Sequence, residues 1–279
     1  MQDFQSVFEI LPPWLRQLVE QCALNEVEDI RFRCERPPSV CIGEVERELS
    51  QKTVSQREIE NILLAAADHS SYAVQDRLSE GFLTIPGGHR IGVCGSVVQK
   101  GSERITVKQI SSLCIRLARR IPMQTLPKLT QSTLLIGIPG SGKTTLLREC
   151  IRSLSDAGRH IGLSDERGEI AACIGGVAQF DVGRCTDVMT GGKKADNLLS
   201  MLRSMRPHWL AADEITAPED LQAIALCADC GVHLIATAHA SSEADLFTRP
   251  LYQSLMELQV FKQLVILNSD RTWTQKEVD

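Results

Sequence analysis

The sequence predicts an α/β protein in which a mostly parallel sheet with helices is preceded by a smaller α+β N-terminal domain. Downstream of residue 132, strand and helix patterns alternate, which is typical of a parallel sheet covered by helices. Segments such as WLAAD and HLIATA are apolar throughout, as in strands that are buried on both faces. The stretch 121–132 contains two prolines and a polar cluster, so we expect one domain over 1–125 and a second over 126–279.

The N-terminal region mixes short strands with helices. Residues 30–34 alternate between apolar and basic side chains, which predicts a half-exposed strand. SQRE at 55–58 matches a capping box and predicts the start of a helix, and a second helix is expected over 72–78. FLTIP and RIGVCGSVV predict two strands joined by a turn at 87–88. In a later strand Arg116 alternates with apolar residues, so we expect it on the polar face.

The C-terminal region carries the regular alternation. Strands are expected at 133–137, 160–165, 208–213, 232–238 and 263–267. Helices are expected at 143–155, 195–205, 218–230 and 242–258. Ligands bind open α/β sheets beyond the carboxyl ends of the strands. Polar side chains that follow these strands are therefore the candidate site residues.

A phosphate-binding motif lies between the first of these strands and its helix. GIPGSGKT at 137–144 fits the pattern G-x-x-x-x-G-K-[ST]. Glycines let successive N–H groups converge on phosphate oxygens, and the helix adds its positive end. Lys143 supplies a charge for the β- and γ-phosphates, and the Thr144 hydroxyl is a ligand for Mg²⁺. The predicted nucleotide-binding residues are Gly137, Ile138, Pro139, Gly140, Ser141, Gly142, Lys143, Thr144 and Thr145.

Two carboxylates end the apolar segment WLAADE. Asp213 is predicted to hold Mg²⁺, and Glu214 to act as the general base that activates the attacking water. Taken alone, such a segment is weak evidence, because acidic residues are also common at helix N-termini. The strong phosphate-binding loop upstream favours the catalytic interpretation. The sequence thus predicts an ATPase that uses ATP and Mg²⁺.

Polar groups end two further strands at the same expected edge. Asp165 and Glu166 follow IGLS, and His239 follows LIATA. His239 is a candidate to bond the γ-phosphate or the attacking water, and the alternative is a histidine satisfied by nearby backbone. The remaining histidines, at 69, 160, 208 and 233, follow no motif, and we expect them to be structural.

Composition and charge restrict the class of protein. No apolar run approaches the roughly 18 to 20 residues that span a bilayer, and the start MQDFQSVFEILPPW has no signal-peptide pattern. We therefore expect a cytoplasmic protein, with peripheral attachment at the cytoplasmic face of a membrane left open. The net charge of −5 gives no electrostatic footprint of a nucleic-acid binder. Cys227 and Cys230 lack a second pair of zinc ligands nearby, and we expect both thiols to be buried.

From residue 28 to residue 268 the chain resembles the stage III sporulation protein AA family. These proteins are relatives of the ATPases of type II and type IV secretion systems, within the RecA-like P-loop class. The resemblance rests on DIRFRCERPP, SSYAVQDRLSEGFLTIPGGHRIGVCG, ISSLCIRLAR, the phosphate-binding loop, SDERGEIA, QFDVGRCTDVMTGGKKADNLLSMLRSMRP, ADEI and IATAHA. GGHRIGV and the segment 181–207 are the most distinctive parts. The chain departs from the pattern at Thr216, where a glycine is expected, and at Cys114, where an asparagine is usual.

The resemblance implies a RecA-like P-loop core and a site assembled from several motifs. It implies that Asp213 and Glu214 form Walker B and that Asp165, Glu166 and His239 match an acidic box and a histidine box. The N-terminal region corresponds to a domain that folds over the nucleotide in a hexamer, which makes its arginines candidates for phosphate contacts. The implied catalytic residues are Glu214, Lys143, His239, Asp165, Glu166, Arg90 and Arg116.

The resemblance also implies a cellular role. It predicts a homo-hexameric mechanoenzyme that acts with membrane-associated channel proteins of the sporulation apparatus and energises transport between mother cell and forespore. The main alternative is a RecA-like ATPase that acts on nucleic acid; the acidic net charge and the lack of a basic or aromatic-rich module disfavour it. A small-molecule kinase is disfavoured because Glu214 suits attack by water and no arginine-rich lid follows the loop.

Overall fold

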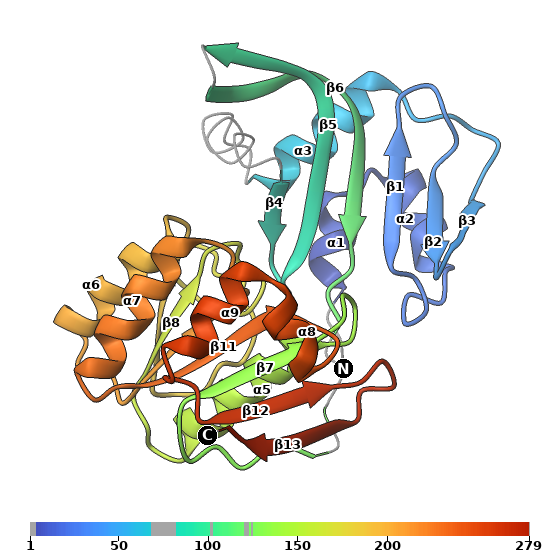
Figure 1. Ribbon diagram of the computed structural model, residues 1–279. Helices are drawn as coiled ribbons and strands as arrows, with labels where there is room; N and C mark the ends of the chain where they lie inside the picture. Colours follow the sequence, from blue (N-terminus) through green and yellow to red (C-terminus); the bar gives the residue numbers. More distant parts are fainter. Residues whose placement is uncertain (1–3, 68–81, 101–102, 120–122, 124, 279) are drawn as a thin grey trace. The chain divides into compact units, whose positions relative to one another are not determined.

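The computed structural model describes residues 4–67, 82–100, 103–119, 123 and 125–278. The chain divides into two compact units, Met1–Arg120 and Ile121–Asp279, and each contains its own sheet (Figure 1). The expected helix over 72–78 lies outside the described residues. None of the described helices has the length and apolar character needed to cross a bilayer.

The N-terminal unit is built on an antiparallel sheet with the strand order β3-β2-β1-β6-β5-β4. Its helices are α1 (Gln5–Ile10), α2 (Pro13–Glu20) and α3 (Gln56–Ala66). Its strands are β1 (Asp29–Arg33), β2 (Ser39–Ile42), β3 (Val45–Glu48), β4 (Phe82–Ile85), β5 (His89–Lys100) and β6 (Glu103–Arg116). The predicted capping box is confirmed, since the Ser55 side chain accepts from the Glu58 N–H and the Glu58 carboxylate accepts from the Ser55 N–H.

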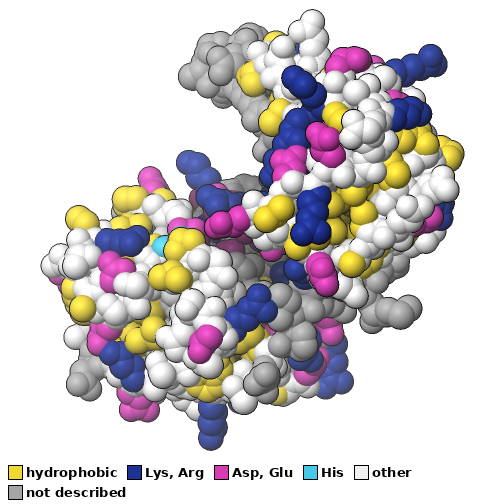
Figure 2. Space-filling model, turned by 90° about the vertical axis from the view of Figure 1, so that its right-hand side faces the viewer, with side chains coloured by type: hydrophobic (Ala, Val, Ile, Leu, Met, Phe, Trp, Pro, Cys, Tyr) yellow, Lys and Arg dark blue, Asp and Glu magenta, His cyan; other side chains and the backbone are white. Residues whose placement is uncertain are grey.

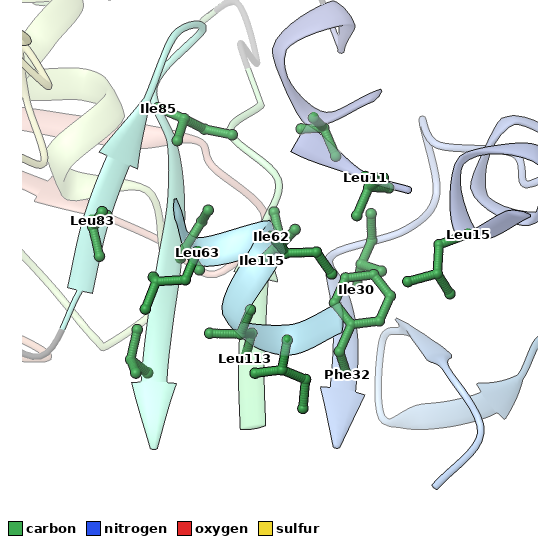
Figure 3. Packing of buried hydrophobic residues seen from close by; sticks show 14 of the residues in the cluster. Leu11, Leu15, Ile30, Phe32, Ile62, Leu63, Leu83, Ile85, Leu113 and Ile115 are labelled. Carbon is green, nitrogen blue, oxygen red and sulfur yellow. The ribbon is translucent and has the colours of Figure 1, made fainter. Parts of the chain in front are cut away.

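One face of this sheet is covered by the three helices, and the other is polar. Ile30 and Phe32 of β1 are fully buried, and they pack with Leu113 and Ile115 of β6 beneath α3 (Figure 3). The alternation predicted for residues 30–34 therefore marks the core face of β1. Arg116 is on the opposite face, with a side chain that is 74% exposed.

The C-terminal unit has the strand order β13-β12-β7-β11-β10-β8-β9. Among the described residues every neighbouring pair is parallel except β12 and β13. The strands are β7 (Thr133–Gly137), β8 (Ile161–Asp165), β9 (Thr186–Thr190), β10 (Trp209–Ala212), β11 (His233–His239), β12 (Gln263–Leu267) and β13 (Trp273–Glu277). The helices are α5 (Lys143–Asp156), α6 (Lys194–Ser204), α7 (Pro218–Asp229), α8 (Glu243–Thr248) and α9 (Pro250–Glu257).

Helices cover both faces of this sheet, as its apolar strands predict. Alternate residues of the central strands point to opposite sides: Leu134 and Ile136 pack with α6, α7 and α9, whereas Leu135 packs with α5 (Figure 1). The carboxyl ends of β7, β10 and β11 lie together at one edge, because these strands are parallel neighbours. The loops that follow them therefore meet in space.

The structure of this unit differs from the expectations in three details. The single helix expected over 242–258 is two helices, because Pro250 cannot continue α8 and holds Arg249 in an extended conformation (φ −109°, ψ 120°). The edge strands β9 and β13 were not predicted; their exposed, polar sequences lack the apolar signal of the central strands. Cys227 is buried as expected, but Cys230, just beyond α7, is exposed.

Candidate active site

The loop between β7 and α5 keeps its curled shape because glycine is required at three of its positions. Gly140 and Gly142 have φ of 78° and 100°, in the left-handed region that side chains disfavour. A Cβ at Gly137 would lie 2.6 Å from the Ser141 hydroxyl and 2.8 Å from the carbonyl oxygen of Leu267. The loop leads directly into α5, whose N-terminus carries unpaired N–H groups suited to phosphate.

A cavity of about 350 Å³ lies beside this loop, within the range of small-molecule sites. Its lining brings together ten of the residues predicted from the sequence: Pro139, Gly140, Gly142, Lys143, Thr144, Thr145, Glu166, Asp213, Glu214 and His239. Four other predicted residues do not line the cavity: Gly137, Ile138, Ser141 and Asp165. Thr237, near the end of β11, also lines the cavity.

Lys143 is buried against its own loop. Its ammonium donates to the carbonyl oxygens of Gly137 (2.8 Å) and Ile138 (2.9 Å) and lies 3.0 Å from Nδ1 of His239. Burial lowers the pKa of Lys143, and the negative charges of Glu214 and Asp213 oppose that shift. A phosphate that drew this ammonium into the cavity would place a negative charge in direct contact with it.

His239 stands between this lysine and Glu214. Its Nε2 lies 3.1 Å from Oε2 of Glu214. An ammonium can only donate, so Nδ1 of His239 accepts from Lys143, and Nε2 of the ring faces the Glu214 carboxylate. The backbone N–H of His239 donates to the hydroxyl of Tyr252 in α9, which fixes the end of β11. The three groups thus form a continuous chain from Lys143 through His239 to Glu214.

Asp213 is held by a neighbouring strand. The buried hydroxyl of Thr237 donates to its Oδ1 at 2.8 Å, and no described residue bonds its Oδ2. The Asp213 carboxylate and the Thr144 hydroxyl line the same cavity. Both are hard oxygen donors of the kind that Mg²⁺ prefers.

Asp165 organises a loop rather than facing the cavity. Its side chain is buried, and its two oxygens accept from the backbone N–H groups of residues 169–172 at 2.8 to 3.3 Å. This arrangement shapes the turn after β8 that presents Glu166 and Glu169 to the cavity. Asp165 therefore acts on the site through its neighbours.

Lys194 lines the cavity and was missed by sequence reasoning. It begins α6 and is only 4% exposed. Its ammonium donates to the backbone carbonyl oxygen of Glu214 at 2.5 Å. The same ammonium lies 3.5 Å from Oε2 of Glu166 and 3.6 Å from Oδ2 of Asp220. The available signal was a pair of lysines, Lys193 and Lys194, after two glycines, but lysines are seldom buried, so the pattern did not identify Lys194.

Arg90 and Arg116 belong to the N-terminal unit. They are direct cross-strand partners on β5 and β6. The Arg116 Nε donates to Oδ1 of Asp29 at 3.3 Å, and the guanidinium of Arg90 lies 3.8 Å from the centre of the Phe82 ring. The two predicted arginines therefore share the polar face of that sheet.

The chain is similar in sequence to known proteins along nearly its whole length. A family model described as sporulation stage III, protein AA, matches residues 1–276. Stage III sporulation protein AA of Bacillus subtilis (strain 168) is 34% identical over 278 residues, which cover 94% of this chain and 90% of that protein. Protein SEEDLING PLASTID DEVELOPMENT 1 of Arabidopsis thaliana is 26% identical over 263 residues, covering 91% of this chain and 36% of that protein.

Solved structures share the fold. The ATPase DotB of Legionella pneumophila aligns with a TM-score of 0.59 at 17% identity, over 95% of this chain and 79% of DotB. The pilus retraction motor PilT, solved with bound ADP, aligns with a TM-score of 0.60 at 15% identity, over 94% of this chain and 77% of PilT. This chain has the α/β fold of these two proteins. By the match along its whole length, it belongs to the sporulation stage III protein AA family.

Proposed function

We propose that this chain is a P-loop ATPase that converts ATP and water to ADP and phosphate. The observation that supports the proposal is the convergence of Lys143, Asp213, Glu214 and His239 on one cavity. They come from the carboxyl ends of three neighbouring parallel strands. This is the edge at which open α/β sheets bind their ligands.

The residues present fit ATP and Mg²⁺. The left-handed glycines keep the loop open to phosphate oxygens, and Lys143 offers a cation whose hydrogen bonds go to two carbonyls and to the His239 ring. Thr144 and Asp213 would hold the metal ion, which supplies charge shielding for the phosphates. Asp213 retains an oxygen for this purpose, because Thr237 occupies only Oδ1.

Each protein group has a distinct task in the hydrolysis. Binding of the phosphates moves Lys143 from the carbonyls of Gly137 and Ile138 towards the negative charge. Nδ1 of His239 then loses its partner and becomes available to the phosphate or the water. Glu214 accepts a proton from the attacking water, and Nε2 of His239 lies 3.1 Å from its carboxylate.

We extend the proposal to a homo-hexameric mechanoenzyme in which Arg90 and Arg116 complete the nucleotide site. The support is the family and the fold shared with PilT, a retraction motor. In this role the protein works at the cytoplasmic face of a membrane and energises a channel between mother cell and forespore. A nucleic-acid motor has less support, since basic and acidic side chains are interspersed on the face drawn in Figure 2.

The test is release of phosphate from ATP by the full chain with and without Mg²⁺, together with native mass measurement. We expect Mg²⁺-dependent turnover and assembly into hexamers with ATP. The Lys143→Ala variant should lose turnover and bind ATP more weakly. Turnover in that variant equal to the unmodified protein would overturn the assignment of the loop.

A further inference from the structure

A second, larger cavity lies in the C-terminal unit at the edge of the sheet opposite the nucleotide cavity. Its volume is about 1200 Å³, and it lies where β8, β10 and β11 begin. The apolar part of its lining includes Leu199 and Leu202 of α6 and Leu226 of α7. Leu226 is 52% exposed, so this groove presents large apolar side chains to solvent.

The charged part of the groove has one sign. Arg159, Arg203 and Arg206 line it, and none of the three forms an ion pair with a described residue. No aspartate or glutamate is among the described lining residues, although the whole chain has 35 acidic against 30 basic residues. The groove is therefore a basic site on an acidic protein.

Three histidines also line the groove. His160, His208 and His233 lie at the starts of the three strands, and the rings of His160 and His208 are 5.0 Å apart. Nothing in the spacing of these histidines, which are spread over more than 70 positions, indicates that they lie together. Parallel strand order brings them to one edge.

Local stability does not explain this concentration of cations. A cation in the last turn of a helix gains about 0.3 to 1 kcal/mol from the helix dipole, and Arg203 is the one lining arginine in such a place. Arg159 and Arg206 lie in loops. Unpaired arginines around an apolar floor are typical of a surface that receives an acidic partner.

We propose that this groove binds an acidic amphipathic helix of a partner protein. The apolar face of the helix packs on Leu199, Leu202 and Leu226, and its carboxylates pair with the three arginines, in the helix-in-groove mode of recognition. Two turns of helix, about 10 Å wide and 11 Å long, occupy roughly 1000 Å³. The groove is of that size.

Helix α6 is one of the elements that line both the groove and the nucleotide cavity. Lys194, at the first position of α6, bonds Glu214, whereas Leu199, Leu202 and Arg203 of the same helix line the groove. Along the helix axis, Lys194 is about 8 Å from Leu199 and about 14 Å from Arg203. A partner that shifts α6 changes the position of Glu214, so binding should alter ATP turnover; this second step rests on the proposed function.

Binding is tested with a labelled synthetic peptide of about 16 residues, with leucines at positions i, i+3, i+4 and i+7 and glutamates beside them. Fluorescence anisotropy with the full chain should give a Kd in the micromolar range, on the order of 10 μM. Arg203→Glu combined with Arg206→Glu should weaken binding at least about tenfold. Leu226→Asp should also weaken peptide binding at least about tenfold, because it removes an apolar contact with the helix.

The matched control is Arg47→Glu combined with Arg57→Glu, two exposed arginines that do not line the groove, and it should bind the peptide unchanged. Thermal unfolding checks that every variant is folded. No binding up to about 1 mM peptide, or equal binding by the groove variants, would overturn the proposal. So would single-stranded DNA that binds through the same arginines when the peptide does not.

Turnover is measured separately. Peptide binding that leaves turnover unchanged removes the connection through α6 but keeps the docking site. Peptide binding to a chain without any ATPase activity contradicts the proposed function and not the docking site.

Discussion

Glu214 and His239 form a close pair, with 3.1 Å between Oε2 and Nε2, at the ends of two neighbouring strands. Because Lys143 donates to the other ring nitrogen, the imidazole ring presents Nε2 to the carboxylate. Any ligand that attracts Lys143 changes what His239 can bond. The pair therefore links the state of the phosphate-binding loop to the orientation of the proposed general base.

His239→Ala should lower ATP turnover by about 10² to 10³-fold, the cost of removing one positioned hydrogen-bond donor. Binding of ATP should change little, since the loop and Lys143 remain. Steady-state turnover and fluorescent-nucleotide titration measure the two quantities. A large loss of affinity with unchanged turnover would show that His239 serves binding instead.

Lys194→Met should reduce turnover, because the backbone of Glu214 loses its donor. It should also lower the free energy of unfolding by up to about 3 kcal/mol, since Asp220 is left buried without its cation. Lys193→Met is the control, because Lys193 is exposed. Chemical denaturation and phosphate release should separate the two variants, and similar behaviour of both would contradict the role given to Lys194.

Arg116→Ala tests the contribution of the N-terminal unit. If this arginine contacts phosphate in the assembled enzyme, turnover should fall by about 10²-fold or more, as for arginines that stabilise phosphoryl transfer. Asp29 keeps Arg31 as a partner at 3.1 Å, so the fold should survive, as circular dichroism will show. Lys108→Ala, an exposed site on the same strand, should have no effect; full activity of Arg116→Ala would exclude the contact.

The cysteines should differ in reactivity. Burial raises the pKa of Cys150 to about 12 and that of Cys227 to about 11, so both thiols stay protonated and shielded near pH 8. Cys94 and Cys230 are exposed and should be alkylated first by iodoacetamide. Peptide mass spectrometry of the folded protein reads out the order, and early labelling of Cys227 would contradict the packing of α7.

The central strands and the phosphate-binding loop could be predicted because their signals are local. β7 and β12 were expected with the bounds that the structure shows, since continuous apolar runs mark strands buried on both faces. The edge strands β9 and β13 carry no such run. Pro250 indicates the break between α8 and α9. The helical pattern on both sides of it nevertheless led to the prediction of a single helix over 242–258.

Outside the phosphate-binding loop, the site was predictable only where a residue ends a strand. Asp213, Glu214 and His239 follow apolar runs, so their edge of the sheet was known from the sequence. Asp165 obeys the same rule but turns its carboxylate to four backbone N–H groups. Lys194 lines the cavity from the N-terminus of α6. Its contacts depend on tertiary packing, which the spacing of residues in the sequence does not indicate.

The central claim is tested most directly by Glu214→Gln, which keeps the shape of the side chain and removes its ability to accept a proton. ATP affinity and the rate of a single turnover are measured on the same preparation, with Mg²⁺ present. We predict affinity within about threefold of the unmodified protein and a hydrolysis rate lower by at least about 10²-fold. Hydrolysis at the unmodified rate would contradict the claim that this cavity is the active site of an ATPase.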